Sequence, residues 1–176
     1  MSDPKSERRA IVAVLLTSTL LTMLAIWGLI VASADLSNRP IPQDLAPEQV
    51  VLLEALGSNP LRRPFAAANF VVSSLVLIGS FMLSWRRKLA FWWIRQAVTA
   101  KVLWVIANTI AVAYHLRVVY PKMQPEIVSG DTAVVLGAAS LSLVALAILS
   151  IALHLGAAGR ATRPDIKAFV EGTARA

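Results

Sequence analysis

The sequence contains no cysteine. This absence excludes disulfide bonds, thiolate metal sites and cysteine nucleophiles. Histidine is scarce as well, because only His115 and His154 occur among the 176 residues. They fall near opposite ends of their apolar segments, so we expect them to lie about a membrane thickness apart, too far to share one haem or one zinc ion. We therefore expect no metal site and no bound cofactor.

Acidic residues are missing from every long apolar segment of the chain. Proton-coupled transporters generally place a carboxylate or a chain of histidines inside the membrane. The sequence also lacks the phosphate-binding P-loop and the G-x-S-x-G motif of serine hydrolases, and no Ser-His-Asp set is evident. We therefore expect a protein that is not an enzyme, and we assign no catalytic residue.

Apolar residues are in excess, since they make up 57% of the chain. A typical soluble domain has about 45–50%. They are concentrated in four uncharged runs, 10–34, 65–85, 102–116 and 132–159. A helix of about 20 apolar residues spans the hydrocarbon core of a bilayer. We predict an all-α protein, an integral membrane four-helix bundle that forms one domain in the lipid bilayer.

The charges that flank each run set the expected boundaries. Transmembrane helices are expected at 10–34, 65–85, about 99–118 and 132–159, with an outer segment at 35–64, an inner interfacial turn at 86–98, an outer loop at 119–131 and a cytoplasmic tail at 160–176. In the outer segment, "APEQVVLLEALG" predicts a short surface helix from about Pro47 to Gly57. In the tail, Pro164 begins a short helix that either packs under the bundle or docks a partner.

The net charge of +7 comes from basic residues beside the apolar runs, so we expect topology-setting charges and no nucleic-acid partner. With the N-terminus inside, twelve of the 17 lysines and arginines fall on the cytoplasmic side. Both termini are then cytoplasmic by the positive-inside rule. The general character of the chain suggests a multi-pass protein of a bacterial inner (plasma) membrane.

A polar stripe crosses the third run, because Lys101, Asn108 and His115 lie seven residues apart on one helix face, with Asn69 on the second run as a further candidate. The uncharged part of this run has 15 residues. It covers only about 22 Å, which is less than the thickness of the hydrocarbon core. Two arrangements would allow this short segment to span the hydrocarbon core.

In the first arrangement, which we favour, Lys101 and Arg117 extend outward to the two interfaces, and "RRKLAFWWIRQ" lies partly in the inner interface. In the second, one long helix starts near Leu89, straight after a tight turn. Antiparallel pairing then places Lys101 opposite Ser73, near the middle of the bilayer. A charge there costs at least about 2.5–3.5 kcal/mol, so Lys101 would be a functional candidate.

The fourth run carries a face of small residues at alternating spacings of four and three. The pattern runs through Ala138, Ser142, Ala145, Leu149, Ala152, Gly156 and Gly159, and all of these except Leu149 are small. Small residues allow close helix packing in membranes. We expect this face to pack within the bundle, or alternatively against a neighbouring chain.

These features favour an accessory or scaffold subunit that binds a partner membrane protein or forms a homo-oligomer. A small oligomeric channel or transporter, with a polar path along the second and third helices, is the alternative. A membrane sensor that uses the outer segment is the third possibility.

Overall fold

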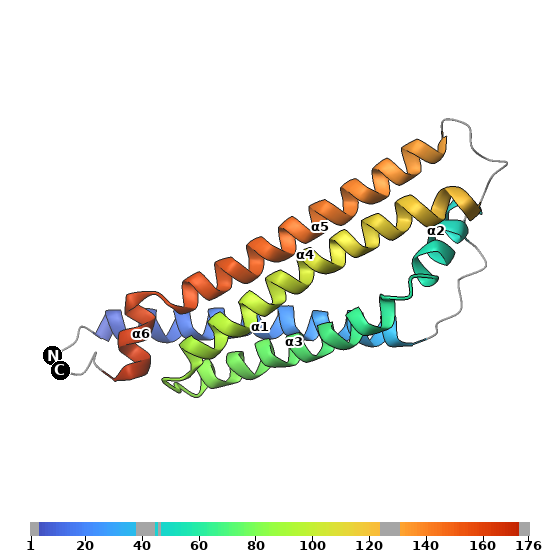
Figure 1. Ribbon diagram of the computed structural model, residues 1–176. Coiled ribbons are helices and arrows are strands. Elements are labelled where there is room, and N and C mark those ends of the chain that lie inside the picture. The colour runs from blue at the N-terminus through green and yellow to red at the C-terminus, as the bar shows by residue number, and fades with distance from the viewer. Residues whose placement is uncertain (1–3, 38–44, 46, 124–130, 173–176) are drawn as a thin grey trace.

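The computed structural model describes residues 4–37, 45, 47–123 and 131–172, and its described elements are all helices (Figure 1). Four of them are long: α1 (Pro4–Leu36), α3 (Arg62–Ser84), α4 (Ala90–Met123) and α5 (Asp131–Ala161). Two are short: α2 (Pro47–Gly57) and α6 (Pro164–Glu171). Parts of the expected outer segment and outer loop, 38–44, 46 and 124–130, lie outside the described residues.

The four long helices are each long and apolar enough to cross a membrane. In lipid, backbone N–H and C=O groups find no water, so an apolar segment satisfies them internally as a helix. Many large side chains on these helices, such as Met23, Phe70 and Leu141, are exposed. Such a surface suits contact with acyl chains. The prediction of an all-α chain with four long apolar helices is confirmed.

The helices pack in chain order, with α1 along α3, α3 beside α4, and α4 beside α5 (Figure 1). The main core contains side chains from all four long helices and α6, among them Leu21, Leu83 and Ile94. From α5 it takes only Ala157, Ala158 and Ala161, at the end of that helix. The rest of α5 therefore contributes little to the core.

The turn between α3 and α4 is shorter than the interfacial turn we expected at 86–98. The Arg87 N–H donates to the Met82 carbonyl at 2.9 Å, and Arg86 takes a positive φ of 55°, which reverses the chain. α4 then begins at Ala90, whereas we expected the third span to begin near residue 99. Gly79 helps to hold the first turns of α4 against α3, because an added Cβ would lie 3.0 Å from Ile94 Cγ1.

The short helices close opposite ends of the bundle (Figure 1). The expected surface helix is α2, and its Ala55 is buried against Leu116 and Tyr120 of α4. α6 buries its apolar face, Ile166, Phe169 and Val170, at the end where α1 begins. The Arg86 guanidinium lies 4.3 Å from the centre of the Phe169 ring, which links the α3–α4 turn to α6. The apolar face of the tail is thus used inside the chain.

Candidate functional site: a buried lysine and its cavity

Lys101 is buried between α1, α3 and α4, with only 4% of its surface exposed. Its ammonium group donates to Asn69 Oδ1 and, at 3.1 Å, to Ser73 Oγ. It also lies 4.6 Å from the centre of the Trp104 ring, a cation–π distance. Trp104 stands one turn after Lys101 on α4, so the two side chains share a helix face.

Two further contacts tie this group together. Asn69 Nδ2 donates to the Gly28 carbonyl of α1 at 3.2 Å, and the Ser73 hydroxyl donates to Asn69 Oδ1 at 3.2 Å. Gly28 is needed for this approach, since an added Cβ would lie 2.2 Å from Ser73 Oγ. We call Lys101, Asn69, Ser73, Trp104 and Gly28 the Lys101 cluster.

The position of Lys101 along the bundle corrects the arrangement that we favoured. Ser73 stands at the midpoint of α3, which runs from Arg62 to Ser84, and Lys101 contacts it directly. Lys101 therefore does not reach outward to an end of the bundle, and the second arrangement describes the structure. The physical reason is the tight turn at Arg86, which lets α4 continue as one helix through residues 90–98.

Lys101 has no carboxylate partner among the described residues. The two ion pairs in this part of the chain are Arg62–Asp35, at 3.5 Å, and Lys167–Glu171, at 3.9 Å, and both lie elsewhere. A buried ammonium group without a counter-ion is costly, even when neutral oxygens hydrogen-bond to it. This is the least expected electrostatic feature of the fold.

A cavity of about 440 Å³ adjoins the cluster. Leu24, Trp27 and Val31 of α1 and Leu146, Leu149 and Leu153 of α5 supply much of its apolar wall. Its polar lining comes from Asn69, Lys101, Asn108, Thr109, Ser150 and His154. A mostly apolar cleft with a few convergent polar groups has the general character of a small-molecule site.

His154 also lines the cavity, a role that the sequence did not reveal. It is 3% exposed, and its Nδ1 lies 2.7 Å from the Ser150 carbonyl oxygen. A carbonyl only accepts, so we assign the proton to Nδ1, which makes Nε2 an acceptor in the neutral ring. Nε2 is buried and has no hydrogen-bond partner among the described residues. Sequence spacing could not link it to Lys101, because it lies on another helix.

The residues of the predicted polar stripe do not all lie at one site in the structure. Asn69 and Lys101 are hydrogen-bonded to each other, and Asn108 lines the same cavity, half-buried. His115 is apart from them, because its Nε2–H donates to the Ala55 carbonyl of α2 at 2.9 Å and lies 3.2 Å from Ser58 Oγ. His115 fastens α2 to the bundle.

The predicted packing face of α5 is not buried within the bundle. All six of its small residues, Ala138, Ser142, Ala145, Ala152, Gly156 and Gly159, are exposed. An added Cβ at Gly156 or Gly159 would meet no atom within 4 Å. Our expectation that this face packs against the chain's own helices is therefore wrong. The α5 residues that are buried in the main core, Ala157, Ala158 and Ala161, do not belong to this face.

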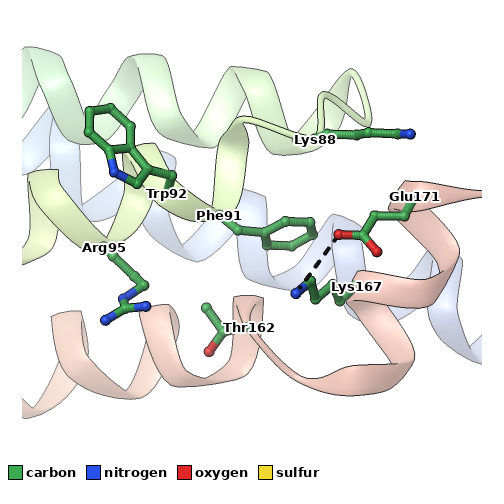
Figure 2. A pocket seen from close by; sticks show the side chains of 7 residues that line it. All are labelled: Lys88, Phe91, Trp92, Arg95, Thr162, Lys167 and Glu171. Carbon is green, nitrogen blue, oxygen red and sulfur yellow. Dashed lines mark ion pairs between the residues drawn. The ribbon is translucent and has the colours of Figure 1, made fainter.

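A second, smaller pocket of about 340 Å³ lies between α4, the end of α5 and α6 (Figure 2). It combines Lys88, Arg95 and Lys167 with the aromatic rings of Phe91 and Trp92. Figure 2 shows Arg95 extending from α4 toward α5, and Lys167 paired with Glu171. Cations beside aromatic rings are typical of the membrane–water interface.

Among the described residues, no group of three or more histidine and acidic side chains is arranged to hold a metal ion. Comparison of the chain with protein-family models, with curated proteins and with solved structures finds no match. The function therefore has to be argued from the surfaces and the site of this chain alone.

Proposed function

We propose that this chain is a non-enzymatic accessory or scaffold subunit that binds another membrane protein through the small-residue face of α5. The observation that carries the proposal is the exposure of all six residues of that face. Lipid tails are as apolar as leucine, so helices associate in membranes through close backbone approach at small residues. A face meant only for lipid has no need of such residues at regular spacing.

α5 is also the helix best placed for a partner. None of the side chains in its most apolar segment is buried inside the chain, whereas a third of the corresponding segment of α1 is. Gly156 and Gly159 stand about one turn apart, and nothing in the described structure covers them. A partner helix could approach the α5 backbone there without displacing any side chain of the bundle.

The proposed location is a bacterial inner membrane, with the α6 end of the bundle in the cytoplasm. The end of the bundle formed by the α3–α4 turn, the end of α5 and α6 is rich in cations. They are Arg86, Arg87, Lys88, Arg95, Arg160, Arg163 and Lys167. Cytoplasmic loops carry such an excess, and the anionic inner leaflet attracts it. The basic pocket of Figure 2 would lie at the level of the lipid head groups.

A channel or transporter is the second candidate, because Asn69, Lys101 and Asn108 line one cavity. The cavity walls are largely leucine, valine and tryptophan, and His115 lies outside it. These features suit a bound apolar molecule better than a hydrated path.

The proposal is tested by purifying the full chain in mild detergent and measuring the particle by native mass spectrometry. We expect a particle heavier than one 18.9 kDa chain, and Gly156→Leu should release the single chain by blocking close helix approach. Gly137→Leu is the matched control, since Gly137 is also on α5 and open but lies off the face. Masses at multiples of 18.9 kDa would assign the face to a second copy. A wild-type particle that is monomeric and free of partners would refute the proposal.

A further inference from the structure

We propose that the cavity beside Lys101 binds a single-chain amphiphile whose head group is a carboxylic acid, such as a long-chain fatty acid. This inference concerns a lipid-like ligand and does not depend on the partner surface of α5. It rests on two buried polar groups whose residues both line one largely apolar cavity. These are the Lys101 ammonium group, which lacks a counter-ion among the described residues, and the unpartnered Nε2 of His154.

The hydrogen-bonding capacity of the two groups defines the head group. An ammonium group has three N–H donors, and Asn69 and Ser73 accept from two of them. His154 Nε2 is an acceptor, because Nδ1 is assigned the proton that bonds to the Ser150 carbonyl. Lys101 thus has a cationic donor and His154 a neutral acceptor, and both residues line the cavity. A carboxylic acid offers the complement, since its C=O accepts and its O–H donates.

The charge balance is favourable in either protonation state of the ligand. If the proton stays on the acid, the head group forms two hydrogen bonds and adds no charge. If the proton passes to His154 Nε2, the resulting carboxylate lies with two cations, the imidazolium and the Lys101 ammonium group. The carboxylate is then shared by the two cations, and the net charge of the site, one positive, is the same in both states. Hydrogen bonds to charged groups are worth more than those between neutral groups.

The walls of the cavity suit an alkyl chain. Leu24, Trp27 and Val31 of α1 and Leu146, Leu149 and Leu153 of α5 all line it, so an alkyl chain bound there would contact both helices. The volume of about 440 Å³ is within the usual range of ligand sites. That range is about 300–1,000 Å³. A phosphodiester group fits less well, because it accepts hydrogen bonds but has no O–H for His154.

The test uses the tryptophans that line the cavity, Trp27 and Trp104, as reporters. The full chain is placed in nanodiscs of phosphatidylcholine and titrated with stearic acid that carries bromine atoms on its chain, which quench nearby tryptophan. We expect quenching that saturates. The methyl ester of the same acid should bind at least about tenfold more weakly, because it keeps the C=O but loses the O–H. A tenfold change in the dissociation constant equals about 1.4 kcal/mol.

Three variants locate the site. Lys101→Met should weaken binding at least tenfold, whereas Lys122→Met, a change to an exposed lysine on the same helix, should leave it unchanged. Ala147→Leu narrows the cavity without touching a polar group and should also weaken binding. The comparison of acid and ester uses the wild-type chain, so it decides the matter even if Lys101→Met does not fold.

Several results would overturn the proposal. Quenching that rises without saturation and equally for acid, ester and Lys101→Met would mean partitioning into the bilayer alone. Equal and saturable binding of acid and ester would exclude the head group that we assign. Displacement of the brominated acid by phosphatidylglycerol as readily as by unlabelled stearic acid would identify a phospholipid site instead.

Discussion

Replacing Gly28 by alanine tests whether the Lys101 cluster holds α1 against α3. The added methyl group would lie 2.2 Å from Ser73 Oγ and 3.1 Å from Lys101 Nζ. Both distances are below ordinary van der Waals contact, so a side chain or the helix itself has to move. The Ser73 side chain can rotate away most easily, and it would then give up its contacts with Lys101 and Asn69.

The expected loss of stability follows from three contributions. Hydrogen bonds between membrane helices average about 0.6 kcal/mol each. Overpacking of a tight interior costs about 1–3 kcal/mol. Alanine favours the helix over glycine by about 0.5–1 kcal/mol, which offsets part of the loss. We therefore expect Gly28→Ala to lower the free energy of unfolding by about 1–3 kcal/mol.

The assay is unfolding of the full chain in mixed micelles, followed by the loss of helical circular dichroism as a denaturing detergent is added. Gly137→Ala is the matched control, because an added Cβ there meets no atom within 4 Å. It should be neutral or slightly stabilising. Since Ser73 Oγ makes the closest contact, Gly28→Ala combined with Ser73→Ala should be less destabilising than the sum of the single changes by at least about 0.5 kcal/mol.

Two outcomes would contradict this reasoning. If Gly28→Ala behaves like Gly137→Ala, then α1 does not approach Ser73 as closely as the structure shows. If the two single changes are additive within about 0.3–0.5 kcal/mol, then Ser73 is not the side chain that the methyl group displaces.

Two further predictions concern the polar residues of the stripe. Asn69→Leu removes an acceptor from the buried Lys101 ammonium group, so we expect a loss of about 1–3 kcal/mol in the same unfolding assay. Asn108→Leu, outside the cluster, should change stability by less than about 0.5 kcal/mol, and equal losses would argue against the assignment. His115→Leu removes the bonds to α2, so amide hydrogen exchange should accelerate in Pro47–Gly57 but not in the long helices. Tyr114→Leu, a change at the exposed residue next to His115, should leave hydrogen exchange in α2 unaltered. If Tyr114→Leu accelerates exchange in α2 as much as His115→Leu does, the role assigned to His115 is wrong.

The sequence by itself determined the class of the protein and the number of its long apolar helices. Uncharged apolar runs need internal backbone hydrogen bonds in lipid, so helix formation depends only on local composition and length. Local signals also predicted the two short helices, through a proline at the start of each. The seven-residue spacing predicted that Lys101 and Asn108 share one side of the third helix, and both line the same cavity.

Only the tertiary structure decided how deep Lys101 lies and what surrounds it. The depth depends on where the α3–α4 turn ends. Because α4 starts nine residues earlier than expected, Lys101 lies opposite the middle of α3 and not at the expected interface. The environment depends on helices distant in sequence, since Gly28 and His154 reach the site from α1 and α5. The exposed face of α5 was likewise undetermined, because spacing shows which residues share a face but not which neighbour covers it.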